Sequence, residues 1–170
     1  DALVNLADAF SELGRLDEAI ASFKRAIVIK PDSAEVQYNL GVALTTLGRL
    51  DESLACYERA VAIKPDYAEA HNNLGGVLFS LGRLDETLAS YRRVVAIRPD
   101  HAEAHRNLGA VLFNLGRLDE AVAACQRALA IRPESAEALS NLGLVLGGLG
   151  KFDEAIASHQ RALAIKPEFP

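Results

Sequence analysis

The sequence lacks an excess of basic charge and lacks long hydrophobic runs. Its 170 residues include 18 lysines and arginines against 23 aspartates and glutamates, which gives a formal net charge of −5. Such a balance offers no basic footprint for nucleic acid or for an anionic lipid surface. No apolar run reaches the roughly 18–20 residues of a membrane span, and the N-terminus lacks the basic start and apolar core of a signal peptide. We therefore expect no nucleic-acid partner and no membrane partner.

Methionine is absent and cysteine is rare. Because the chain has no methionine and Asp1 lies inside a unit of the repeat described below, we expect a fragment of a longer protein. The two cysteines, Cys56 and Cys125, fall in helices of units two apart. Since neighbouring helices pack about 8–10 Å apart, this separation exceeds the roughly 7 Å between Cα atoms that a disulfide allows. We therefore predict reduced core thiols and a reducing, cytoplasmic location.

Proline is also scarce, but its spacing is regular. Five of the six prolines recur every 34 residues, at Pro31, Pro65, Pro99, Pro133 and Pro167. The residues between them repeat with the same period. The units span about 1–32, 33–66, 67–100, 101–134 and 135–170. A self-similarity of this length predicts a single stacked array over residues 1–170 and not one globular core.

Each unit is expected to form a hairpin of two short helices. In residues 32–65, Asp32 and Glu35 resemble a capping box that starts a first helix over 34–47, and Gly48 ends it. Acidic residues then start a second helix, which Pro65 ends. The residues expected to be buried are Val36, Leu40, Ala43, Leu44 and Leu47 in the first helix, and Leu54, Ala55, Ala60, Val61 and Ile63 in the second.

A glycine recurs in the middle of the first helices, at Gly41, Gly75, Gly109 and Gly143. Glycine costs about 1 kcal/mol relative to alanine in a helix interior. A cost repeated in four of the five units suggests that the glycine is compensated by a favourable contact in each of them. We predict that the two helices of each hairpin approach closely at this glycine.

These residues resemble the tetratricopeptide repeat, a 34-residue helical hairpin with a Leu-Gly pair, a later aromatic residue and a closing proline. The Leu-Gly pairs are Leu40-Gly41, Leu74-Gly75, Leu108-Gly109 and Leu142-Gly143, and the aromatic residue is Phe23, Tyr57 or Tyr91 before it becomes Cys125 and His159. The resemblance covers essentially the whole chain. It implies an all-α fold, a right-handed superhelical solenoid of five antiparallel helix pairs. It also implies that the first helices line a concave groove for a protein or peptide partner.

In every first helix, an asparagine comes directly before the leucine that recurs with the 34-residue period. These asparagines are Asn5, Asn39, Asn73, Asn107 and Asn141. Asparagine is unfavourable inside helices because its side chain competes for the backbone. In one interpretation, these amides form a ladder that binds the main chain of an extended peptide. In the other, each amide bonds a neighbouring helix and stabilises the array. The row resembles the tetratricopeptide region of O-linked N-acetylglucosamine transferases, which implies that asparagines hold substrate chains.

Other positions of the first helices vary from unit to unit. The candidate ligand-binding residues are Asn39, Asn73, Asn107 and Asn141 of the asparagine row, together with Tyr38, Asn72, Arg106, Phe79 and Phe113. Aromatic residues commonly carry binding energy, so Phe79 and Phe113 are candidate anchors, although they could instead pack between neighbouring first helices. Arg106 is the only basic residue on a first helix, which disfavours the carboxylate clamp of chaperone-binding members of the family.

The sequence contains no catalytic constellation, and we expect neither a metal nor a cofactor. His101 and His105 lie four residues apart, but the glutamate between them is misplaced for a zinc-protease motif and His101 falls at a helix cap. We therefore expect a non-catalytic scaffold that binds an extended peptide in its asparagine-lined groove. The alternatives are the substrate-recruiting arm of a glycosyltransferase whose catalytic domain is absent, and a structural or self-assembly module.

The last helix is expected to leave an apolar strip open. No polar closing helix follows Ile156, Leu163 and Ile165. Large exposed strips normally find partners. This strip predicts either a covering segment in a longer protein or end-to-end self-association through the uncapped C-terminal helix.

Overall fold

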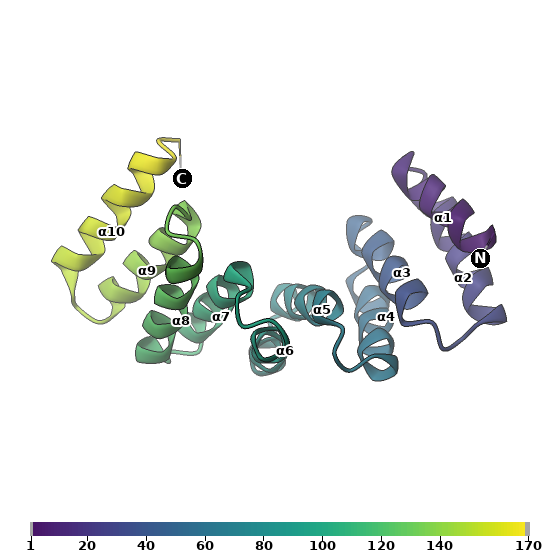
Figure 1. Cartoon of the computed structure of the whole chain (residues 1–170), viewed down its shortest axis with the longest axis horizontal. Coiled ribbons are helices and arrows are strands. Elements are labelled where there is room, and N and C mark those ends of the chain that lie inside the picture. The colour runs from purple at the N-terminus through teal and green to yellow at the C-terminus, as the bar shows by residue number, and fades with distance from the viewer. Residues whose placement is uncertain (1, 169–170) are drawn as a thin grey trace. The chain divides into compact units, whose positions relative to one another are not determined.

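The computed structural model describes residues 2–168, and within them the secondary structure is helical, without strands (Figure 1). The helices are α1 (Ala2–Glu12), α2 (Leu16–Ile29), α3 (Ala34–Thr46), α4 (Leu50–Ile63), α5 (Ala68–Ser80), α6 (Leu84–Ile97), α7 (Ala102–Asn114), α8 (Leu118–Ile131), α9 (Ala136–Gly148) and α10 (Phe152–Ile165). The even-numbered helices begin at residues 16, 50, 84, 118 and 152, so the period of the sequence is also the period of the fold. The predicted all-α repeat is confirmed.

The chain divides into two compact units, residues 1–83 and residues 84–170. In unit 1, α1 packs on α2 and α3 packs on α4, and contacts between α2 and α3 and between α4 and α5 join successive repeats. In unit 2, α7 packs on α8 and α9 on α10, with α6 against α7 and α8 against α9. Helices of 11–14 residues are marginal alone in water, so each depends on these neighbours.

The first helices after α1 are capped one residue later than the sequence predicts. Ser33 is the N-cap of α3, and its hydroxyl accepts a hydrogen bond from the backbone N–H of Val36 at 3.4 Å. Ser135 caps α9 in the same way, at 3.2 Å from the nitrogen of Ala138. The prediction of Asp32 as the cap is therefore wrong. The N-cap is the residue directly before the first helical residue, and α3 begins at Ala34, so the cap is Ser33 and not Asp32.

A left-handed glycine ends the first helix of each hairpin. Gly48 has φ +73°, and the N–H of the next residue, Arg49, donates to the carbonyl oxygen of Leu44 at 2.9 Å. These are the features of a Schellman turn, which favours glycine because other residues are strained at this φ. Arg49 then donates from Nε to Glu52 Oε1 at 2.6 Å, within the acidic first turn of α4. The predicted helix end and the predicted acidic start are both confirmed.

The two helices of a hairpin meet at the mid-helix glycine. A Cβ atom on Gly41 would lie 2.7 Å from Tyr57 Cε1, and one on Gly109 would lie 2.6 Å from Cys125 Sγ. A Cβ on Gly143 would lie 2.6 Å from His159 Nε2. These separations are shorter than van der Waals contact, so the predicted close approach is confirmed for these three hairpins.

Two residues expected in the core are exposed. Leu47 is 41% exposed because it lies beyond the last turn of α3, as its C-cap. Ala55 lies on the solvent side of α4, whose buried residues are Ser53, Leu54, Tyr57 and Ala60. The core of this hairpin therefore centres on the tyrosine.

Both cysteines are free thiols, and burial raises the pKa of each to about 11. Cys125 is fully buried, facing Gly109 across the α7–α8 seam, whereas Cys56 is half-buried. A thiol that stays protonated at neutral pH is a poor nucleophile and a poor metal ligand. The pKa shift therefore favours a packing role for Cys125.

We expect alkaline pH to destabilise the chain through Cys125. The thiol has a raised pKa in the folded state, so its contribution to stability is complete below about pH 9 and is lost as the pH rises toward about 11. At about pH 10.5 the loss is about 2 kcal/mol in the free energy of unfolding. Denaturant titrations at neutral pH and at about pH 10.5 should show a smaller fall in Cys125→Ala than in the parent. Part of the fall remains in the variant, because burial also raises the pKa of Cys56 to about 11 and that of Tyr67 to about 12. A fall in Cys125→Ala equal to that of the parent would contradict the assignment.

Candidate functional site

In unit 1, a cavity of about 540 Å³ lies between α1 and α3. Its lining is partly polar and partly apolar, and consists of Asp8, Ser11, Glu12, Gly14, Leu16, Phe23, Asn39, Val42, Ala43 and Thr46. A neighbouring cavity of about 530 Å³ is lined by Asn5 and shares Asp8 with the first. Two members of the asparagine row, Asn5 and Asn39, therefore open onto concave surface along α1.

The amides of unit 1 also bond neighbouring helices. Asn39 donates from Nδ2 to Asp8 Oδ1 on α1 at 3.3 Å. Asn73 donates from Nδ2 to the hydroxyl oxygens of Tyr38 and Tyr57 at 3.3 and 3.4 Å. These bonds agree with the structural interpretation of the row. They engage only the amide nitrogen, so each amide oxygen keeps its capacity to accept another hydrogen bond.

In unit 2 the row behaves differently. Asn107 on α7 and Asn141 on α9 are half-buried, and their amides form no hydrogen bond with any other group in the span 2–168. Asn39 bonds Asp8 of the preceding repeat. For Asn141, the equivalent residue of the preceding repeat is Ala110, which has no side-chain acceptor. The amides of unit 2 are therefore the ones with full capacity to bind a ligand.

Tyr38 lies in an aromatic cluster. Its ring centroid is 5.9 Å from that of Tyr57 and 5.1 Å from that of Tyr67. Burial raises the pKa of Tyr38 and of Tyr57, and raises that of Tyr67 to about 12, so all three hydroxyls stay protonated at neutral pH. The cluster joins α3, α4 and the start of α5. Tyr38, a candidate ligand-binding residue, therefore has a packing role.

The remaining candidates differ in their accessibility. Phe79 is 41% exposed. Phe113 is half-buried and lies 3.4 Å from the position of a Cβ on Gly148, so it packs between α7 and α9. Asn72 Oδ1 is buried and has no hydrogen-bond partner among the described residues. Of the two phenylalanines, Phe79 is thus the one that presents an exposed ring.

Arg106 lines a small charged cavity of unit 2, with a volume of about 250 Å³. Its Nη2 lies 3.9 Å from Glu103 Oε1. Arg132 and Glu137 also line the cavity, so its charges are two of each sign. Arg106 is therefore not a free cation that would attract an acidic peptide by itself.

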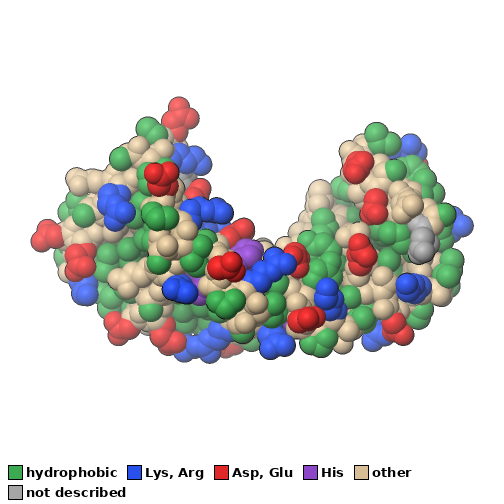
Figure 2. Space-filling view, viewed as in Figure 1, with side chains coloured by type: hydrophobic (Ala, Val, Ile, Leu, Met, Phe, Trp, Pro, Cys, Tyr) green, Lys and Arg blue, Asp and Glu red, His purple; other side chains and the backbone are tan. Residues whose placement is uncertain are grey.

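The first helices are acidic. They carry one arginine and six acidic residues, Asp8, Glu12, Glu35, Glu69, Glu103 and Glu137. Their net charge is thus −5, equal to that of the whole chain. The positive and negative charges of the rest of the chain therefore cancel. Over the face seen in Figure 2, acidic, basic and hydrophobic side chains are interspersed.

The histidines have local structural partners. His101 Nδ1 accepts a hydrogen bond from the N–H of Ala104 at 3.1 Å as the N-cap of α7. His105 Nε2 donates to the carbonyl oxygen of Pro99 at 2.9 Å. Residues 2–168 contain no group of three or more His, Cys, Asp or Glu side chains that could hold a metal ion. None of the helices in the same span is long and apolar enough to cross a membrane.

Sequence comparisons identify the repeat. A profile described as "Tetratricopeptide repeat" matches residues 66–132 and 100–168, and one described as "TPR repeat" matches residues 7–48 and 43–82. The chain belongs to the tetratricopeptide repeat family. No curated protein sequence matches it.

Solved structures share the tetratricopeptide fold. The crystal structure of MamA superposes with a TM-score of 0.90 at 25% identity, covering 95% of both chains. MamA 41-end from Desulfovibrio magneticus RS-1 gives 0.92 at 21% identity, covering 98% of this chain and 94% of the other. YrrB, described as "a TPR protein with an unusual peptide-binding site", gives 0.89 at 24% identity, covering 98% and 86%. The all-α solenoid class is thereby confirmed.

Proposed function

We propose that this chain is a non-catalytic interaction scaffold that holds an extended peptide segment of a partner protein along its first helices. The observation that carries the proposal is the cavity between α1 and α3, where Asn39 lies beside apolar and acidic side chains. In unit 2, Asn107 and Asn141 occupy the equivalent positions of α7 and α9. The peptide-binding site named for the structurally similar YrrB supports the general role.

The charge of the first helices points to a basic ligand. A lysine or arginine of the peptide would place its charged head near Asp8 and Glu12. Its aliphatic stem would cover Val42, which is 37% exposed. The amides of the row would bind the peptide main chain, which is the same in every sequence. Such a site recognises an extended basic segment more by its backbone and charge than by its exact sequence.

The proposal extends to the whole array and to its cellular setting. One tetratricopeptide array spans residues 1–170, and a reducing cytoplasm suits its two free thiols. The resemblance of the asparagine row to O-linked N-acetylglucosamine transferases offers a second version, in which the bound peptide is a substrate. The gene that encodes the chain separates the versions, since a glycosyltransferase domain following the array would favour the second.

A displayed library of unstructured dodecapeptides tests the proposal. We expect selection on the immobilised chain to enrich peptides rich in lysine and arginine. Calorimetry should then show that the double change Asn107→Ala and Asn141→Ala weakens binding of a selected peptide by about tenfold or more, because about two hydrogen bonds are lost. The matched control is Gln126→Ala with Gln160→Ala, which removes two amides from second helices. Equal affinity of both double variants, or enrichment of acidic peptides, would contradict the proposal.

A further inference from the structure

The last helix presents an apolar stripe to solvent. Phe152, Ile156 and Leu163 are 68%, 55% and 46% exposed. Their spacing of four and seven residues puts them on one face of α10. The open strip expected from the sequence at this end of the array is therefore present at Ile156 and Leu163. Ile165 is 43% exposed, but it lies on the opposite side of α10 because it is nine residues from Ile156.

The first helix presents a second stripe, of a different kind. Leu6 and Leu13 are 44% and 70% exposed, and the small residues Ala2 and Ala9 between and beside them are exposed as well. These positions are also spaced for one helical face. In the next repeat, the equivalent positions are Val36, Leu40, Ala43 and Leu47, of which the first three are buried.

The junction between α2 and α3 shows how two such stripes fit together. Ile20 of α2 and Leu40 of α3 belong to one hydrophobic cluster, and each is 4% exposed. At the repeat period, Ile20 is equivalent to Ile156, and Leu40 is equivalent to Leu6. Leu16 and Ile27 pack against the same cluster, and their equivalents on α10 are Phe152 and Leu163. The exposed stripes of α10 and α1 therefore correspond, position by position, to the two sides of the α2–α3 junction.

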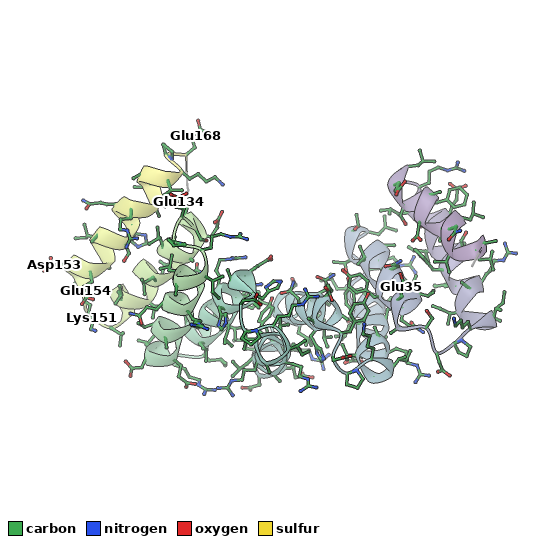
Figure 3. The ribbon with its side chains drawn as sticks, in the orientation of Figure 1. Glu35, Glu134, Lys151, Asp153, Glu154 and Glu168 are labelled. Carbon is green, nitrogen blue, oxygen red and sulfur yellow. The ribbon has the colours of Figure 1, made fainter. Side chains whose placement is uncertain are left out.

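One charge pair extends this match. Near the α2–α3 junction, Arg59 Nη2 lies 3.2 Å from Asp32 Oδ1, in the turn after α2. The equivalents are Arg25 on α2 and Glu168, which Figure 3 shows just beyond the end of α10. Their charges are again opposite, so an α10–α1 contact in this register would pair Glu168 with Arg25.

We propose that two copies of this chain stack head to tail, with α10 of one copy on α1 of the next in the register of α2 on α3. The partner is a second copy because the two ends of the chain carry apolar residues and opposite charges at the positions that pair at and near the α2–α3 junction. The contact is heterologous, since different surfaces meet, and it leaves one free stripe on each partner of a dimer. Longer assemblies therefore form as the concentration rises.

Sedimentation equilibrium of the full chain tests this with one variant at each end. We expect the parent to show an average mass that rises with concentration. Leu6→Arg and Ile156→Arg should each remain monomeric, because each buries a charge in one half of the contact. An equimolar mixture of the two should form a one-to-one complex that grows no further, since each variant keeps one intact stripe. Leu47→Arg, a control on an exposed leucine outside both stripes, should associate like the parent.

Three outcomes would overturn the proposal. The first is a parent that stays monomeric at its highest soluble concentration. The second is Leu6→Arg self-association with none in Ile156→Arg, which would mean that α10 pairs with α10. The third concerns the register. Arg25→Glu and Glu168→Arg should each weaken association roughly two- to fivefold, and their combination should restore it, as for an exposed ion pair. A combination weaker than either single change would exclude this register.

Discussion

Replacement of Tyr57 by alanine should lower the free energy of unfolding by about 3–5 kcal/mol. The side chain is fully buried in the seam of the α3–α4 hairpin, directly against Gly41. Its ring packs on Tyr38, and its hydroxyl lies 3.3 Å from Thr45 Oγ1 and 3.4 Å from Asn73 Nδ2. The truncation thus opens a cavity and also leaves polar groups without their partner.

Tyr57→Phe is the matched control. It keeps the ring and removes the hydroxyl, so we expect a loss of only about 1 kcal/mol. The first hairpin already has Phe23 at this position, fully in its core. Because unfolding of a repeat array need not be two-state, hydrogen exchange of the α3 and α4 amides should accompany denaturant titration. Equal losses in the two variants would show that the hydroxyl network, and not the ring, dominates.

Gly109→Leu should destabilise the chain by about 2–3 kcal/mol. A Cβ atom there would lie 2.6 Å from Cys125 Sγ and 3.4 Å from the backbone oxygen of Ala121. The backbone of α8 cannot turn away as a flexible side chain can, so the two helices must separate. Thermal unfolding followed by circular dichroism should show a Tm lower by about 5–10 °C.

Gly147→Leu is the control for this change, because it introduces the same side chain at a glycine of a neighbouring first helix, α9. No heavy atom lies within 4 Å of the position of a Cβ on Gly147, within the described part of the chain. Leucine also favours the helix more than glycine does. We expect stability equal to or slightly above that of the parent. A comparable loss in both variants would mean that the effect of Gly109→Leu does not arise from the seam.

The helix bounds could be predicted closely because local backbone chemistry sets them. The first helix predicted over 34–47 is observed over Ala34–Thr46, since Gly48 supplies the positive φ that ends it. Pro65 similarly follows the last residue of α4, Ile63. The cap was misplaced because Asp32 and Ser33 are both good N-cap residues, and only the three-dimensional start of the helix selects between them.

The partners of the asparagine row could not be predicted from the row itself. The amides of Asn39 and Asn73 bond residues of the preceding repeat, at positions that differ between the two repeats. Asn39 meets an acceptor in Asp8, whereas the equivalent neighbour of Asn73 is Val42 and cannot accept a hydrogen bond. Asn73 bonds tyrosine hydroxyls instead. A regular row thus acquires different local roles through its irregular surroundings.

The identical spacing of the second helices has a consequence for how such a chain can change in length. Because α2, α4, α6, α8 and α10 all end 34 residues apart, at residues 29, 63, 97, 131 and 165, a duplicated block of one period would bring its own cap, turn and seam. It would also bring another amide and another acidic first turn. Evolution or a designer could therefore lengthen the row of first helices one repeat at a time without inventing a new interface.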